Sequence, residues 1–200
     1  FGTARGPLGV KTSGKHDAPP GAAHARSTAP GRGATVQASN PRSTTMKLEG
    51  SCHCKAVRFT VEAPSPVPFM RCYCSICRKT AGGGGYAINL GAARDTLRID
   101  GEDALSVYRA RLADGSLSTG ERNFCRHCGS ALWLWDPTWP ELVHPHASAI
   151  DAPLPVPPQR VHIMLASKAN WVEPELRPGD ERFDDYPDES LAQWHERHGL

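Results

Sequence analysis

The sequence has no long apolar run and no strong excess of either charge, since its net charge is +2. A membrane-spanning helix needs roughly 20 consecutive apolar residues, and no stretch approaches that length, so we expect no membrane partner. The first residues also lack the apolar run of about 7–15 residues that marks a secretory signal peptide. We therefore expect reducing, cytoplasmic surroundings for this chain.

Acidic and large apolar residues are scarce in residues 1–45. This segment is mainly Gly, Pro, Ala, Ser and Thr, with six basic residues against the single acid Asp17. Such a composition buries too little apolar surface to offset the entropy cost of ordering, which predicts a disordered low-complexity extension. Met46 is the first methionine and directly precedes the first patterned segment. We expect Met46 to be the natural start, with a transit peptide as the alternative for residues 1–45.

The rest of the chain is mildly acidic. Six basic residues and one acid give residues 1–45 a charge of +5, so the total of +2 leaves −3 for residues 46–200. A nucleic-acid-binding domain usually presents a basic face, and therefore we expect no nucleic-acid partner.

Helical periodicity is also rare, and the patterning indicates a mainly β fold over residues 46–180. Residues 56–62 alternate apolar and polar side chains, as in a strand with one buried face. The sequence of residues 188–199 favours one short helix in a C-terminal tail, residues 181–200, capped at Asp188 or Ser190. Other predicted strands are 86–90, 96–99, 105–110, 131–135 and 160–166. We also expect a hairpin turn at residues 114–116 and an extended connection at residues 153–158. The tryptophans expected in the core are Trp133, Trp135 and Trp171.

Seven cysteines form three clusters. An odd number cannot be fully paired in disulfides, and the C-x-C and C-x-x-C spacings are typical of metal-binding turns. Zinc suits sets of thiolates on a β-rich scaffold, so the clusters predict zinc sites. The clusters are Cys52 and Cys54; Cys72, Cys74 and Cys77; and Cys125 and Cys128.

Seven ligands divide naturally into four and three. Four thiolates close a structural zinc site, whereas three leave a coordination position free, as in catalytic zinc sites. Spacing alone leaves two divisions open. Residues 74 and 77 would pair with 125 and 128, leaving 52, 54 and 72, or residues 52 and 54 would pair with 125 and 128, leaving the contiguous triplet.

Four segments resemble one family. The stretches "GSCHCKAVRFTVEAP", "RCYCSICRKTAG", "FCRHCGSALW" and "ASAIDAPLPVPPQRVHIMLASKANWVE" occur in the order and spacing of the glutathione-dependent formaldehyde-activating enzymes, a family that includes the centromere-protein-V-like proteins. The likeness covers about residues 48–175. It departs from the family at Lys55, where the first motif usually has glycine. A residue other than glycine costs on the order of 1 kcal/mol if that position requires a positive φ.

This resemblance implies an Mss4-like arrangement of small β-sheets around two zinc ions. It also implies a carbon–sulfur lyase activity, the reversible addition of glutathione to formaldehyde, with glutathione as co-substrate and a small-molecule thiol adduct as the product. It further implies a structural zinc on Cys52, Cys54, Cys125 and Cys128 and a catalytic zinc on Cys72, Cys74 and Cys77.

Two further predictions concern the substrate-binding residues and an alternative function. Arg78 and Lys79 are candidates for binding the carboxylates of a glutathione-like substrate, although a solvated basic pair is the simpler interpretation. The alternative function is a non-catalytic, zinc-stabilised binding module of the centromere-protein-V-like type. The intact cysteine triplet favours the enzyme, because a purely structural module needs no open metal site.

Overall fold

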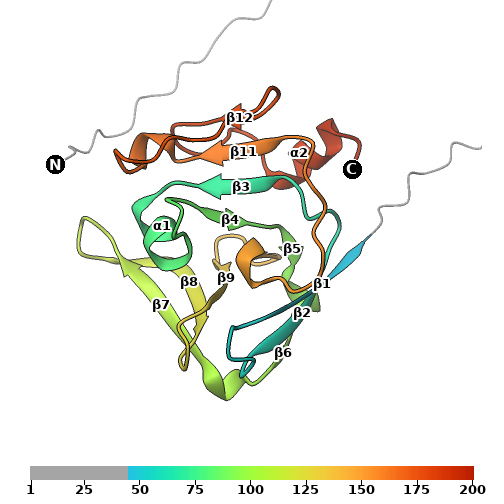
Figure 1. Cartoon of the computed structure of the whole chain (residues 1–200), viewed down its shortest axis with the longest axis vertical. Coiled ribbons are helices and arrows are strands. Elements are labelled where there is room, and N and C mark those ends of the chain that lie inside the picture. The colour runs from blue at the N-terminus through green and yellow to red at the C-terminus, as the bar shows by residue number, and fades with distance from the viewer. Residues whose placement is uncertain (1–44) are drawn as a thin grey trace, which may run out of the picture. The chain divides into compact units, whose positions relative to one another are not determined.

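The computed structural model describes residues 45–200, which form a mainly β domain (Figure 1). Its twelve strands and two α-helices confirm the mainly β fold expected from the sequence. The expected disorder of residues 1–45 falls, apart from Thr45, outside the described residues. Within the described part, no helix is long and apolar enough to cross a membrane. Short 3-10 helices occupy Arg94–Thr96, Glu102–Ala104, Ala147–Ala149 and Leu165–Ser167.

A three-stranded antiparallel sheet begins the domain, in the order β1-β2-β6. Phe59 and Val61 of β2 are buried while Arg58 and Glu62 are exposed, so the alternation read from the sequence marks a real strand with one buried face. The strands are β1 Met46–Ser51, β2 Arg58–Ala63 and β6 Arg98–Asp100.

A five-stranded sheet forms the second layer, in the order β5-β10-β9-β8-β7. β7 and β8 form the hairpin expected at residues 114–116, with Gly115 at a positive φ of 86° in its turn. Much of β8 is only partly buried, so its sequence, LSTGERNFC, lacks the alternation that would reveal it. The strands are β5 Ala92–Ala93, β7 Leu105–Arg111, β8 Leu117–Cys125, β9 Ala131–Trp135 and β10 Leu142–Pro145.

A four-stranded sheet lies across the top of Figure 1, in the order β12-β11-β3-β4. β3 pairs parallel with β11 and antiparallel with β4, and the chain passes from β3 directly into α1. All four residues of β11 are buried, including the polar side chains of Arg160 and His162, so this strand shows no alternation of buried and exposed positions. The elements are β3 Phe69–Cys72, α1 Ser75–Ala81, β4 Ala87–Asn89, β11 Arg160–Ile163 and β12 Glu181–Arg182.

Two apolar clusters hold these layers together. The larger joins the three- and five-stranded sheets and includes Trp133 and, at its edge, Trp135. The smaller lies against the four-stranded sheet and includes Cys72 and Cys77. Trp171 is 63% exposed, so the expectation of a core position for it is wrong. Its ring lies beside Gly85, in a connecting segment outside both clusters.

Residues 181–200 pack onto the domain instead of trailing from it. β12 extends the four-stranded sheet, and α2 (Leu191–Arg197) buries Trp194 in the smaller apolar cluster. The helix begins at Ser190, whose side chain accepts a hydrogen bond from the backbone of Gln193 while the Gln193 side chain accepts one from the Ser190 backbone N–H. This reciprocal capping satisfies two N-terminal donors and explains why so short a helix is stable.

Candidate metal centres

Four cysteines meet between the three- and five-stranded sheets. Their Sγ atoms all lie within 4.8 Å of one another, and no disulfide joins them. The Cys52–Cys54 and Cys54–Cys125 Sγ distances are 3.5 and 3.7 Å. Thiolates about 2.3 Å from a tetrahedral zinc lie about 3.8 Å apart, so these sulfurs fit that geometry. The four residues are Cys52, Cys54, Cys125 and Cys128.

Two similar turns shape this four-cysteine cluster. The backbone N–H of Lys55 donates to the Cys52 carbonyl at 3.0 Å, and that of Gly129 donates to the Cys125 carbonyl at 2.8 Å. Lys55 and Gly129 follow the second cysteine of their turns and have φ values of 64° and 74°. The position of Lys55 therefore does require a positive φ, which a lysine adopts at a cost of about 1 kcal/mol.

The other three cysteines gather where β3 passes into α1. Cys72 ends β3, Cys74 caps α1 and Cys77 lies within the helix, and their Sγ atoms also lie within 4.8 Å of one another. The backbone N–H of Cys77 donates to the Cys74 sulfur at 3.3 Å. Among the described residues, no fourth cysteine, histidine or carboxylate joins this three-cysteine cluster.

Burial and the hydrogen bonds among the three thiols shift their pKa values in different directions. Cys72 and Cys77 are buried, whereas Cys74 is partly exposed. Hydrogen bonds from the Cys72 and Cys77 thiols lower the pKa of Cys74 to about 2, and the bond with Cys74 raises the pKa of Cys72. Negative charge therefore concentrates on the Cys74 sulfur, the three sulfurs are placed to surround one cation, and the donor set fits zinc.

The two basic residues suggested as substrate ligands both lie on α1. Lys79 is exposed, and Arg78 is half-buried with its Nε atom lacking a hydrogen-bond partner. Neither residue lines the main pocket described below. A role for them in substrate binding stays a prediction.

A buried polar network lies behind the three-cysteine cluster. The Tyr73 hydroxyl is 2.8 Å from Nδ1 of His162, and Nε2 of His162 is 3.3 Å from the carboxylate of Asp180. Arg160 pairs with Asp180 at 2.7 Å and holds the pKa of that carboxyl below its usual range, although burial acts in the opposite direction. Burial lowers the pKa of His162. Sequence reasoning missed this network, because Tyr73 and His162 are 89 residues apart and no motif connects them.

Two other buried histidines, His144 and His146, belong to neither cysteine cluster. Nδ1 of His144 is 3.1 Å from the Leu90 carbonyl, and Nδ1 of His146 is 3.1 Å from the Asn89 side-chain oxygen. Neither belongs to a group able to hold a metal among the described residues. His144 lies in β10 and His146 directly follows it, and both are buried with Nδ1 bonded to another part of the fold.

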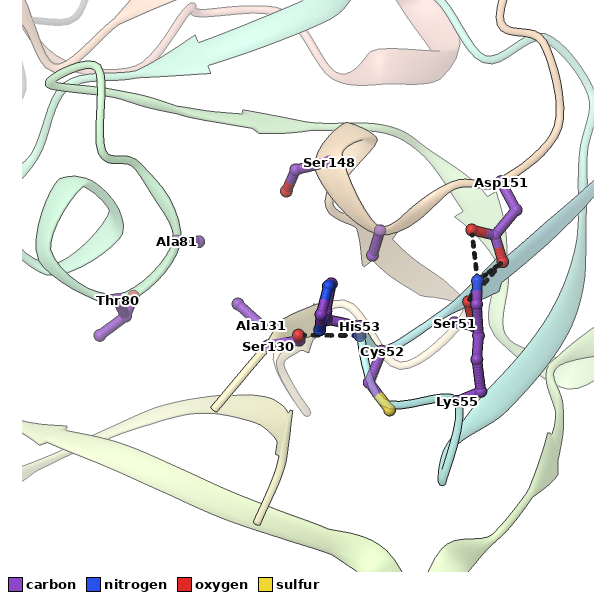
Figure 2. Close-up of a pocket in the computed structure, with 11 residues that line it drawn as sticks. Ser51, Cys52, His53, Lys55, Thr80, Ala81, Ser130, Ala131, Ser148 and Asp151 are labelled. Atoms are coloured by element: carbon purple, nitrogen blue, oxygen red, sulfur yellow. Dashed lines mark hydrogen bonds and ion pairs between the residues drawn. The ribbon is translucent and has the colours of Figure 1, made fainter. Parts of the chain in front are cut away.

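A pocket of about 560 Å³, which we call the main pocket, opens between α1 and the turn that carries Cys52 and Cys54 (Figure 2). Thr80 and Ala81 of α1 form one side, and the Lys55–Asp151 ion pair forms the opposite side. The remaining lining is mostly polar and comprises Ser51, Cys52, His53, Ser130, Ala131, Ser148 and Ala149.

Comparison with known proteins assigns the chain to a family. Residues 47–167 match the model of the glutathione-dependent formaldehyde-activating enzymes. A Halomonas elongata protein whose name provisionally gives it that activity is 64% identical over 155 residues, covering 78% of this chain and 98% of the relative. A crystal structure of a Rhodobacter sphaeroides protein is 30% identical, with a TM-score of 0.43, and covers 55% of this chain and 92% of that one. The chain therefore belongs to the glutathione-dependent formaldehyde-activating enzyme family.

Proposed function

We propose that this protein is a zinc-dependent carbon–sulfur lyase that catalyses the reversible addition of glutathione, or a related thiol, to formaldehyde. The observation that carries the proposal is the three-cysteine cluster, which lies apart from the four-cysteine cluster and has three sulfur donors with no fourth ligand among residues 45–200. The printed name of the Halomonas elongata relative supports glutathione and formaldehyde as the reactants.

In this proposal the two clusters have different tasks. Cys52, Cys54, Cys125 and Cys128 hold a structural zinc that ties the first two sheets together, and Cys72, Cys74 and Cys77 hold a catalytic zinc. A zinc ion held by three protein ligands acts as a Lewis acid at its remaining position and there favours the ionised form of a thiol or hydroxyl group. Because all seven cysteines are free of disulfides, we place the activity in a reducing compartment such as the cytoplasm.

The chain's own residues orient and shield this reaction. In the forward direction the thiol sulfur forms a bond to the carbonyl carbon, and the thiol proton ends on the new hydroxyl group, so that nothing is oxidised or reduced. Burial of Cys72 and Cys77 excludes water from the inner side of the cluster, and partial exposure of Cys74 leaves one approach open. The Tyr73–His162 hydrogen bond anchors the segment between two of the cysteines.

The first prediction is that Cys74→Ser abolishes catalysis but not folding. NMR exchange spectroscopy of formaldehyde with glutathione should show faster exchange with wild-type protein and the uncatalysed rate with the variant. Zinc content should fall from two ions per chain to one, because a serine hydroxyl is a poor zinc ligand. Ser75→Ala, at an exposed neighbouring position, serves as the control and should keep both zinc ions and the exchange rate.

Two outcomes would contradict the proposal. Wild-type protein that accelerates exchange with no thiol in a panel would remove the lyase function. A Cys74→Ser variant that unfolds would make the triplet structural and would favour a zinc-stabilised binding module instead.

A further inference from the structure

The main pocket carries opposite charges at one side and hydroxyl groups around it. Nζ of Lys55 lies 3.2 Å from the Asp151 carboxylate and 2.7 Å from the Ser51 hydroxyl (Figure 2). Lys55 and Asp151 have side chains 48% and 49% exposed, so both charges face solvent as well as each other. Typical small-molecule pockets are mainly apolar with a few polar groups. A pocket lined mainly by polar groups suits a strongly polar ligand.

Lys55 occupies its position in a strained backbone conformation. Its φ of 64° lies in the left-handed region, which a glycine would adopt without penalty. Residues held in such conformations tend to cluster at ligand-binding and catalytic sites, where the surrounding structure maintains the strain. The cysteine turn accounts for the positive φ, as at Gly129, but a lysine in place of the glycine that would suit it puts an ammonium group in the pocket beside Asp151, which indicates a role for the charged side chain.

The opposite side of the pocket lies close to the three-cysteine cluster. Thr80 and Ala81 line the pocket and follow Cys77 by three and four residues on the same helix. Side chains at these spacings share one helix face, with Cβ atoms about 5–6 Å apart. The pocket therefore begins one helical turn from the candidate catalytic cysteines and ends at the Lys55–Asp151 pair.

We propose that this pocket binds the zwitterionic α-amino-acid end of a peptide thiol. The ligand's carboxylate pairs with the ammonium of Lys55, and its ammonium pairs with the carboxylate of Asp151. The Thr80 hydroxyl, which donates its proton to the Ile76 carbonyl at 2.8 Å, accepts from an intervening amide N–H, the Ser148 hydroxyl binds a second amide, and the thiol extends along α1 toward Cys77. The γ-glutamyl end of glutathione has this chemistry. The inference rests on the proposed function and adds to it a binding site that selects thiols by their charged end.

Calorimetry of glutathione binding to zinc-loaded protein tests the site. Lys55→Asn removes the charge while keeping a residue that tolerates a positive φ, and Lys55→Arg keeps the charge. Because charge-assisted hydrogen bonds are lost, Lys55→Asn should raise the Kd for glutathione by about tenfold or more, and Lys55→Arg by about threefold at most. Lys47→Asn controls for loss of a paired surface lysine outside the pocket and should leave the Kd unchanged.

Exchange measured with a second thiol distinguishes a defect in this binding site from a defect in the reaction itself. The exchange of formaldehyde with 2-mercaptoethanol, which has neither charged group, should be equally fast with wild-type and Lys55→Asn protein, whereas Cys74→Ser should lose it. Glutathione binding that is unchanged in Lys55→Asn would overturn the inference, and so would an equal loss of exchange with both thiols. Failure of wild-type protein to accelerate exchange would instead count against the proposed lyase function, because the calorimetric Kd does not depend on catalysis.

Discussion

At the scale of single residues, Tyr73 links the candidate catalytic cluster to the protein interior. It lies between Cys72 and Cys74 in the chain, and its backbone N–H donates to the Ile163 carbonyl at 3.1 Å. Successive side chains of an extended segment point to opposite faces. Tyr73 therefore turns away from its cysteine neighbours toward His162, and this contact holds the cysteine segment against β11.

Our second prediction concerns the hydroxyl group of Tyr73, which contacts Nδ1 of His162. Tyr73→Phe keeps the ring packed on Tyr86, 5.2 Å away between centroids, but leaves Nδ1 of His162 buried without its partner. An unsatisfied buried polar atom costs about 1–3 kcal/mol, so the free energy of unfolding should fall by about that amount. Urea unfolding of the zinc-loaded protein measures it.

Tyr108→Phe is the matched control, because Tyr108 is 45% exposed on β7. Its free energy of unfolding should stay within about 0.5 kcal/mol of wild type. Equal stability of Tyr73→Phe and Tyr108→Phe would show that the buried hydrogen bond contributes nothing to the fold.

The sequence identified the cysteine clusters but not their surroundings. Clustering is a local property, so C-x-C and C-x-x-C turns are visible in a few letters. Which turns come together depends on how the sheets pack, and spacing alone leaves open two ways of dividing the seven cysteines. The network of Tyr73, His162 and Asp180 was invisible for the same reason, since its members meet only through the pairing of β3 with β11.

At the scale of elements, α1 shows what sequence periodicity misses. Seven residues are too few for a helix that is stable on its own in water. α1 instead depends on the Cys74 thiol as its cap and on the buried Cys77 side chain. Strands 131–135 and 56–62 were recognised because their alternation or apolar content follows from their burial, whereas β8 has no such pattern.

The end of α1 supplies a test of this dependence on tertiary packing. A Cβ atom at Gly82 would come within 2.1 Å of the Tyr86 carbonyl oxygen, so the backbone must shift to accept Gly82→Ala. Overpacking of this kind costs about 1–3 kcal/mol, and the thermal midpoint should fall accordingly. Gly83→Ala and Gly84→Ala are controls, because a Cβ there would meet open space. Equal midpoints for all three variants would show that the loop adapts freely.

At the scale of the whole domain, buried histidines make stability depend on pH. Burial lowers the pKa of His144, His146 and His162, in the case of His146 to about 4. These imidazoles lie in or beside different sheets, and their ring nitrogens bond to other parts of the chain. Protonation of any of them in the folded state is therefore unfavourable, whereas an unfolded imidazole has a pKa of about 6.5.

The sign of the effect follows from these pKa values. Between pH 6.5 and 4 the unfolded chain binds a proton at residue 146 that the folded protein does not, so stability is full above pH 6.5 and falls as the pH drops. From pH 7.5 to 5 the loss from His146 alone is about 2 kcal/mol. Acid also weakens the proposed zinc binding by protonating thiolates, and this contribution is common to wild type and variants. Urea unfolding of His146→Gln at both pH values should therefore show a drop smaller than that of wild type by about 2 kcal/mol. Parallel stability curves for the two proteins would show that His146 does not titrate on unfolding.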